Sequence, residues 1–256
     1  MNILVTNDDG INSKGIFDLV TELKKLGHVT VVAPDGQRSA CGHALTIENA
    51  LRVKKFYKND EFFGYAVNGM PSDCVKLALS EILDTKPDIV VSGINHGQNT
   101  SQNIFYSGTA AAASEGMLAG IPSMAVSVVS FDTQYDCRPA AIYAAELAAK
   151  LPGLGLPKDT FLNMNIPSLP YNEIKGTEIT QLSNATWKDA YEKRRDPFGR
   201  EYYWFSGEYI SADEESGSDD WALNQGKISV SPIRINFTNS EFADKLKSTL
   251  LELSTL

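Results

Sequence analysis

Short apolar runs alternate with segments of helical periodicity along most of the chain. The apolar runs are typical of buried strands, and they cover Ile3 to Val5, Val29 to Ala33, Ile89 to Ser92, Met124 to Val128 and Phe161 to Ile166. The helical pattern covers Gly15 to Leu26, Ser72 to Leu83, Thr109 to Leu118 and Pro139 to Leu151. Strands that alternate with helices favour a parallel sheet covered by helices. The pattern therefore predicts a Rossmann-like, doubly wound α/β fold with a mostly parallel sheet.

Some stretches depart from this alternation. Residues Ala44 to Val67 have the shorter period of a β-hairpin, which we interpret as an insertion. Ile174 to Tyr209 mixes aromatic, charged and turn residues, which predicts extended arms or hairpins. The acidic stretch Asp213 to Asp220 is expected to be a mobile surface loop. A strand over Ile228 to Ile235 and a terminal helix over Glu241 to Leu253 should follow it.

The length of the chain suits one α/β core with a smaller appendage. Its 256 residues would leave little core for each of two equal, independent domains. We therefore predict a Rossmann-like core over residues 1–170, which should also carry the candidate site described below. Residues 171–256 would form a C-terminal region of arm, strand and terminal helix that serves oligomerisation.

Composition places the chain among globular proteins. Hydrophobic residues make up 43% and charged residues 21%, which argues against wholesale disorder and a fibrous architecture. The N-terminus, MNILVTNDDG, has no basic region ahead of a long apolar stretch. No later run is apolar enough to span a bilayer. We expect a cytoplasmic protein without a membrane partner.

Charge narrows the class of ligand. A formal net charge of -9 argues against nonspecific nucleic-acid binding, which depends on neutralising backbone phosphates with lysine and arginine. Small molecules are the favoured ligands, and an acidic chain that binds phosphate needs a metal ion, helix N-termini or backbone amides. The three cysteines, Cys41, Cys74 and Cys137, are odd in number and widely spaced, which is typical of buried thiols.

The first candidate site follows the first strand. Asn7, Asp8 and Asp9 precede Gly10 at the carboxyl edge, where open parallel sheets bind their ligands. Two adjacent carboxylates repel each other, so a hard divalent cation would stabilise both in the ionised form. The alternative is a solvated turn in which an aspartate caps the next helix.

Further candidates follow the next two strands. Ser39 offers a neutral oxygen to a metal, and His43 offers a contact to phosphate or a proton shuttle. A hydrogen-bonded structural histidine is the equal alternative for His43. Asn95 lies in a Gly-rich loop and would complete an oxygen shell or simply form a turn. With His43, Asn7 and Asn99 are accessory candidates.

A phosphate site is indicated where Ser107, Gly108 and Thr109 lead into a helix of small residues. Hydroxyls and free amides at a helix N-terminus attract anions. The alternative is an ordinary cap without a ligand. The segment lacks the lysine of a Walker loop, which argues against nucleoside triphosphates. Because these loops all lie at one sheet edge, a metal would polarise a phosphate that the turn binds.

Seven motifs spread over the chain carry a family resemblance. They are NDDG, APDGQRSACGHALTI, NGMPSDCVKLAL, SGINHGQN, YSGTAAAASEG, IPSMAVS and SDDWALNQGKISVSPI. Their residues, order and spacing closely resemble the SurE nucleotidase family over nearly the whole length. The resemblance implies a divalent ion ligated by Asp8, Asp9, Ser39 and Asn95. It also implies a phosphate-binding turn made of Ser107, Gly108 and Thr109.

The resemblance implies an activity and partners as well. Family members hydrolyse nucleoside 5′- and 3′-monophosphates, and some act on short polyphosphate. They use one divalent cation per subunit, magnesium or manganese, which calcium can replace in a crystal. The C-terminal region resembles the family's dimerisation and exchange element, so a homodimer or a dimer of dimers is expected. Ala40-Cys41 and Met70 depart mildly from the family pattern. Cys41 is either a packed, inert thiol or a site of sensitivity to thiol reagents.

The predicted reaction is in-line attack on phosphorus by metal-associated water, with Asp8 and Asp9 mainly as metal ligands. One rival is a nucleotide-cofactor oxidoreductase, but no GxGxxG follows the first strand. The second rival is a noncatalytic nucleotide sensor. Because no cluster of Asn, Gln or aromatic residues is assignable to a base pocket, broad tolerance among nucleotides is expected.

Overall fold

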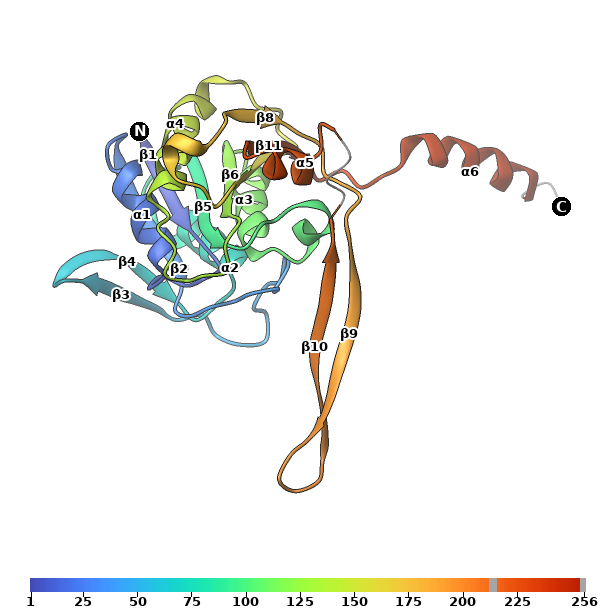
Figure 1. The fold of residues 1–256 in the computed structure, drawn as a ribbon. Coiled ribbons are helices and arrows are strands. Elements are labelled where there is room, and N and C mark those ends of the chain that lie inside the picture. Colours follow the sequence, from blue (N-terminus) through green and yellow to red (C-terminus); the bar gives the residue numbers. More distant parts are fainter. Residues whose placement is uncertain (212–215, 254–256) are drawn as a thin grey trace.

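A nine-stranded sheet forms the centre of the computed structural model, which describes residues 1–211 and 216–253 (Figure 1). The strand order is β3-β4-β2-β1-β5-β6-β7-β11-β8. The strands are β1 (Asn2–Thr6), β2 (His28–Pro34), β3 (Val53–Lys58), β4 (Glu61–Val67), β5 (Ile89–His96), β6 (Ser123–Val128), β7 (Thr160–Ile166), β8 (Thr177–Ile179) and β11 (Ile228–Arg234). Only the β3–β4 and β7–β11 pairs are antiparallel in this sheet. The prediction of a mostly parallel sheet is confirmed.

Helices cover both faces of the sheet, as a doubly wound fold requires. On one face α1 (Lys14–Leu23) packs beside α4 (Arg138–Lys150), and on the other α2 (Pro71–Leu77) packs beside α3 (Gly108–Leu118). Along β1, Ile3 and Val5 pack in the core cluster of α1 and α4, whereas Leu4 packs in that of α2. This alternation explains why β1 is apolar throughout: both of its faces are buried.

The chain reverses direction across the sheet between β1 and β5. It runs outward from β1 through β2 to β4 and then returns to β5, from which β6 and β7 follow on the other side. Such a switch point opens a crevice at the carboxyl ends of the two central strands, where open α/β sheets bind ligands. The loops after β1 and β5 therefore begin at the place where a ligand is expected.

Two predicted elements differ in detail. The helix expected over Ser72 to Leu83 is divided into α2 and a π-helical turn over Ala78–Ile82. In the insertion expected over Ala44 to Val67, β3 and β4 form the hairpin and residues 44–52 form no strand. Short 3₁₀ turns occupy Ser101–Phe105, Leu151–Gly153 and Tyr171–Glu173.

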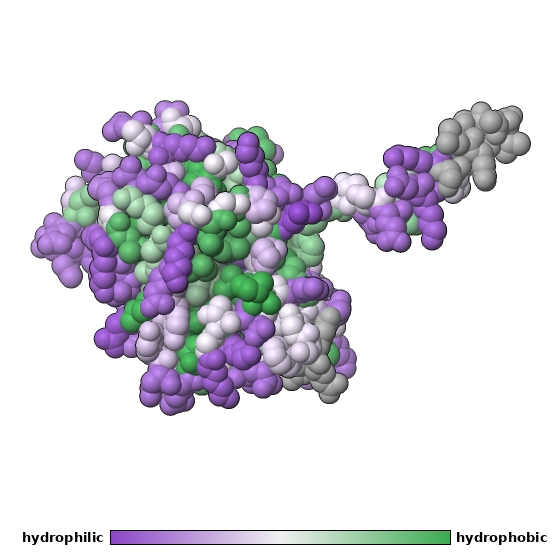
Figure 2. All heavy atoms as spheres, turned by 90° about the horizontal axis from the view of Figure 1, so that it is seen from above, coloured by the Kyte–Doolittle hydropathy of each residue, from purple (hydrophilic) through white to green (hydrophobic). Residues whose placement is uncertain are grey.

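The C-terminal part of the chain contributes to the core and also leaves it. β11 pairs with β7 and β8 pairs with β11, so the sheet crosses the predicted division at residue 170. In contrast, β9 (Thr186–Arg195) and β10 (Glu201–Ile210) form a separate antiparallel hairpin that projects from the body (Figure 1). The terminal helix α6 (Ser240–Leu253) stands clear of the body in both views (Figures 1 and 2).

The expected mobile loop over Asp213 to Asp220 is wrong at its C-terminal end. Residues 212–215 lie outside the described part of the chain. Asp219 and Asp220 are buried and begin α5 (Asp219–Asn224). The Asp219 carboxylate accepts hydrogen bonds from the backbone N–H groups of Ser101 and Ser183, both at 2.9 Å. These donors offset the cost of burying its charge.

No helix within residues 1–211 and 216–253 combines the length and the apolar character needed to cross a membrane.

We predict that the close packing of α3 on β5 is sensitive to one added methyl group. A Cβ on Gly116 would lie 2.4 Å from Ser123 Oγ and 2.7 Å from Val90 Cγ2. Gly116→Ala should therefore lower the free energy of unfolding by roughly 1–3 kcal/mol, although alanine is the better helix former. Gly153→Ala, which would meet no atom within 4 Å, is the matched control. Urea denaturation checks this, and equal midpoints for both variants would contradict it.

Candidate active site

A tight turn directly after β1 presents the two carboxylates. The Asn7 side chain holds the turn closed: its Nδ2 donates to Gly10 O at 3.0 Å and to Ser13 Oγ at 2.8 Å, and its Oδ1 accepts from Gly10 N at 3.2 Å. Gly10 has a φ of +93°, and a Cβ there would lie 2.9 Å from the Gly36 carbonyl carbon. Only glycine fits this approach. The buried Asn7 side chain thus stabilises this turn.

Each carboxylate accepts a hydrogen bond from a neighbouring loop or helix. Asp8 is buried, and its Oδ1 accepts a hydrogen bond from the hydroxyl of Thr109 at the start of α3. Asp9 is half-buried, and its Oδ2 accepts from the backbone N–H of His96 at 3.1 Å. Both donors stabilise the ionised forms. The first turn of α3 and the end of β5 therefore fix the two carboxylates.

Burial raises the pKa of both groups. For Asp8, loss of hydration is the largest cause, and the neighbouring Asp9 adds to it, whereas the Thr109 hydrogen bond opposes it; the pKa rises to about 6. Burial also raises the pKa of Asp9, against the opposing bond from His96. A cation beside the pair would reverse this effect, because an opposite charge favours the ionised form.

The loop after β2 is tied to this turn. The backbone N–H of Arg38 donates to Asp8 O at 2.7 Å, and Ile11 N donates to Pro34 O at 2.8 Å. Ser39 follows Arg38 directly, and its hydroxyl accepts from Gln37 Nε2 at 2.8 Å. Two backbone bonds between loops far apart in sequence thus bring Ser39 to the carboxylates.

A bulge in β5 places Asn95. Ser92 pairs with Ala125 and Asn95 with Ser127, so two residues of β5, Gly93 and Ile94, oppose one residue of β6. The Gly93–Ile94 peptide bond, which is cis, lies in this bulge. Bulges re-aim side chains and are frequent beside functional sites. The Asn95 amide Nδ2 donates to Gly97 O at 2.6 Å, which fixes the orientation of the side chain.

One cavity of about 460 Å³ brings the predicted metal ligands together. Its walls include all four of them, Asp8, Asp9, Ser39 and Asn95, and two other predicted site residues, Asn99 and Ser107. The four ligands come from three loops, after β1, β2 and β5. The cavity lies at the switch point, as the topology predicts.

The three residues of the predicted phosphate turn lie in two different places: Ser107 lines the cavity, whereas Gly108 and Thr109 contact Asp8. Ser107 lines the cavity and caps α3, since its Oγ accepts from Ala110 N at 3.0 Å. Gly108 lies against the carboxylate turn, because a Cβ there would be 2.9 Å from Asp8 Cβ and 2.7 Å from Cys41 Sγ. Thr109 is fully buried and directs its hydroxyl to Asp8. Of the three residues, only Ser107 lines the cavity.

The accessory candidates behave differently. His43 lies outside the cavity walls, with Nε2 2.7 Å from Glu115 Oε1 and Nδ1 3.3 Å from Ser114 Oγ. Both contacts are to residues of α3, and they are typical of a structural histidine. Asn99 lines the cavity, and its backbone is clamped by β7: its N–H donates to Asn165 Oδ1 and its C=O accepts from Asn163 Nδ2, both at 2.8 Å.

Sequence reasoning missed an aromatic part of the cavity. Tyr106, Phe131, Trp187 and Tyr209 line it, together with the amide side chains of Gln98 and Asn103. Trp187 and Tyr209 belong to β9 and β10, so their approach depends on long-range folding. No local pattern signals it. No such cluster was assigned from the sequence, and the structure places one beside the predicted ligands.

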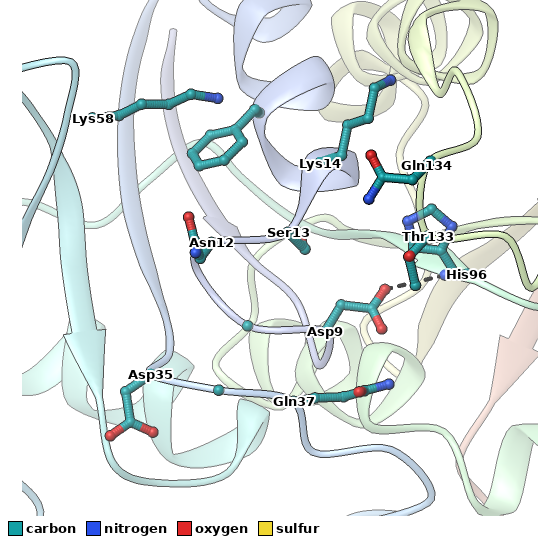
Figure 3. Close-up of a pocket in the computed structure, with 13 residues that line it drawn as sticks. Asp9, Asn12, Ser13, Lys14, Asp35, Gln37, Lys58, His96, Thr133 and Gln134 are labelled. Carbon is teal, nitrogen blue, oxygen red and sulfur yellow. Dashed lines mark hydrogen bonds between the residues drawn. The ribbon is translucent and has the colours of Figure 1, made fainter.

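A second cavity of about 510 Å³ lies on the α1 side of Asp9 and shares Asp9 and His96 with the first (Figure 3). Its two lysines lie on the far side from the Asp9 carboxylate (Figure 3). Lys14 is already paired with Asp18 at 2.8 Å, and Lys58 lies over the Phe17 ring. Burial lowers the pKa of His96, which disfavours a positive charge on its ring. The predicted ligands gather in the first cavity.

The donor set fits a hard divalent cation. It offers two carboxylates with the neutral oxygens of Ser39 and Asn95, which are the ligand types of magnesium and manganese. In the described residues no cluster of three or more His, Cys, Asp or Glu side chains suited to a metal is found. Burial and the Asp8 charge raise the pKa of the nearby Cys41 thiol to about 11, which favours the inert alternative for this cysteine.

Comparisons with known proteins agree with this geometry. The family model described as "Survival protein SurE" matches residues 3–189. The chain is 46% identical to 5′-nucleotidase SurE of Petrotoga mobilis, over 98% of this chain and 99% of the relative. It is 44% identical to 5′-nucleotidase SurE of Chlorobium phaeobacteroides, over 96% of this chain and 95% of the relative. The crystal structure of the SurE protein from Aquifex aeolicus superposes with a TM-score of 0.84 at 39% identity, covering 97% of this chain and 99% of that one.

We predict that Asp8 destabilises the metal-free chain at neutral pH. Its pKa is about 6 when folded and 3.8 ordinarily. Between these values the unfolded chain has lost a proton that the folded chain keeps, so stability falls as pH rises from about 4 to about 6. In chelator at pH 7, Asp8→Asn should raise the free energy of unfolding by about 2–3 kcal/mol, and near pH 4 the gain should largely vanish. Urea titrations check this; a gain that does not depend on pH would contradict it.

Proposed function

This chain belongs to the survival protein SurE family, and on that premise we propose that it is a divalent-metal-dependent 5′-nucleotidase, which hydrolyses nucleoside monophosphates to nucleoside and phosphate. One observation carries the proposal. Two carboxylates, Asp8 and Asp9, line a single cavity with Ser39, Asn95 and the capping residue of α3, Ser107. Ligands for a hard cation and donors for a phosphate thus meet at one site. The proposal extends to 3′-monophosphates and short polyphosphate, which present the same terminal phosphate.

The chain's own residues bind and orient the phosphate. Ser107 presents a hydroxyl at the start of α3, where the positive end of the helix dipole lies. Thr109 donates to Asp8, which favours the ionised form of that carboxylate and fixes its orientation. The N–H of His96 does the same for Asp9. A divalent cation bound to the carboxylates would supply charge neutralisation at the phosphoryl oxygens.

Magnesium or manganese, one ion per subunit, is the cation that we propose. Asp8, Asp9, Ser39 and Asn95 would hold it, with Asp8 and Asp9 supplying the negative charge. All four offer oxygen, and hard cations prefer oxygen to nitrogen or sulfur.

The two rival functions are separable from this one. A dinucleotide-dependent oxidoreductase needs a glycine-rich turn after β1, but NDDG occupies that position with two acids. A noncatalytic nucleotide sensor would bind AMP without releasing phosphate. Phosphate release from AMP in the presence of manganese is therefore the deciding assay.

We predict that excess chelator abolishes turnover of AMP and that Asp9→Asn lowers kcat/KM by roughly a hundredfold or more, because half of the charge that holds the cation is lost. Asp35→Asn is the matched control: Asp35 follows β2 as Asp9 follows β1, but its carboxylate pairs with Arg38 at 2.8 Å. It should retain activity. Phosphate release is measured for each variant, and substantial turnover in chelator would refute metal dependence.

We also propose that the chain forms a homodimer or a dimer of dimers through its C-terminal elements. Residues 191–205, which we call the outer hairpin, expose Tyr191, Tyr203 and Trp204. The exposed fractions of these residues are 67%, 56% and 59%. On α6, Phe242, Leu246 and Leu250 recur every four residues and are exposed. Exposed aromatic and apolar side chains of this kind mark protein interfaces.

The cysteines support a cytoplasmic location for the chain, which we propose. Cys41, Cys74 and Cys137 are all free thiols, and Cys74 and Cys137 are buried. Free thiols are usual in reducing compartments.

We predict that trimming the outer hairpin reduces the number of subunits. Ala190 and Ser206 are directly opposite each other, so residues 191–205 can be replaced by the two-residue turn Asn-Gly. The trimmed chain keeps the Trp187–Tyr209 pair that lines the cavity. Sedimentation velocity should show an assembly at least halved in subunit number, because the exposed aromatics are gone. An unchanged assembly in a folded, trimmed chain would contradict the interface.

A further inference from the structure

The hairpin base, residues 186–190 of β9 with residues 206–210 of β10, forms part of the wall of the candidate cavity. Trp187 and Tyr209 are directly opposite each other in the antiparallel register, and their ring centroids are 5.4 Å apart. Both side chains line the same cavity as Asp8 and Asp9. An interface arm would place its aromatic side chains away from the chemistry, but this pair lies beside it.

Hydrogen bonds hold the two rings in place. Trp187 Nε1 donates to Asn103 Oδ1 at 2.6 Å. Tyr209 donates its hydroxyl to Asp220 Oδ2 at 2.8 Å, and its oxygen lies 3.1 Å from Thr100 Oγ1. The polar atoms of both side chains are therefore hydrogen-bonded to other protein side chains. Flat ring surfaces are what these residues offer to a ligand.

The same contacts fix the hairpin base relative to the phosphate end of the cavity. Asn103 lies in the 3₁₀ turn Ser101–Phe105, which leads to Ser107 and α3. Ser101 Oγ donates to Ala185 O at 2.7 Å, next to the start of β9. Spacing between the rings and the phosphate-binding residues is thus set within one chain. A ligand that carries a phosphate and a planar ring can address both.

We propose that Trp187 and Tyr209 form the nucleoside subsite of this cavity, on which the nucleobase stacks; the inference rests on the proposed nucleotidase function. The occupant is a purine or pyrimidine ring joined to a phosphorylated sugar. Stacking tolerates any base because every base has a π-face, and it is stronger for larger rings. The subsite therefore accepts all common bases and favours purines. The ring faces of Trp187 and Tyr209 contact the base, and no hydrogen-bond donor of these two side chains is needed to recognise it.

Kinetics with AMP and ribose 5-phosphate test this, since the two substrates differ only by the base. Trp187→Ala should lower the ratio of kcat/KM for AMP to that for ribose 5-phosphate by roughly tenfold to a hundredfold, mainly through KM for AMP. Trp187→Phe, which keeps a ring, should restore most of the ratio. Trp204→Ala is the matched control, a tryptophan on the same hairpin with 59% exposure that does not line the cavity. It should leave the ratio unchanged.

The outcomes separate this inference from the proposed function. If Trp187→Ala leaves the ratio unchanged, or lowers activity on both substrates equally, the subsite is overturned. If the wild-type chain hydrolyses neither ester, the nucleotidase function fails, and calorimetric binding of AMP then decides the subsite alone. Weaker binding of AMP to Trp187→Ala than to Trp204→Ala would support it. Equal affinities, or no binding of AMP to the wild type, would overturn it.

Discussion

Keeping the Asp8 carboxylate ionised beside Asp9, away from water, is the constraint around which the site is built. Burial and like charge both oppose ionisation, and the pKa of Asp8 rises to about 6 as a result. The Thr109 hydroxyl and the His96 N–H stabilise the pair only in part. A cation bound at the predicted site would supply the rest, so the feature that destabilises the metal-free fold would also favour metal binding.

This constraint explains why α3 packs so closely. The hydroxyl of Thr109 reaches Asp8 only because Gly108 lets the helix start approach the carboxylate turn. Gly116 lets the next turns of the helix lie against β5. Helix α3 therefore serves two purposes: its N-cap Ser107 faces the cavity, and two residues further on Thr109 supports Asp8, a predicted metal ligand. One helix therefore connects the predicted phosphate-binding and metal-binding residues.

Local patterns in the sequence predicted the parts of the site that follow strands. Asp8, Asp9, Ser39 and Asn95 were identifiable because parallel strands end at one edge, and the topology does bring all four to one cavity. Partners across the fold were beyond such reasoning. Thr109 was assigned to phosphate because a helix start attracts anions, yet its hydroxyl bonds Asp8. The acidic run was interpreted as a loop, but Asp219 is held by backbone donors more than thirty residues away in sequence.

The hairpin shows how a distant segment becomes part of a site. A two-stranded ribbon that projects into solvent is only marginally stable by itself, so its base must be anchored. The Tyr209–Asp220 hydrogen bond attaches the ribbon to α5, and the Trp187–Asn103 hydrogen bond attaches it to the loop that leads into α3. Anchoring at this loop places the two rings in the catalytic cavity. The same hydrogen bonds therefore order the hairpin and shape the cavity. A subunit contact that ordered residues 191–205 would also order the cavity wall on which we propose that a nucleoside stacks.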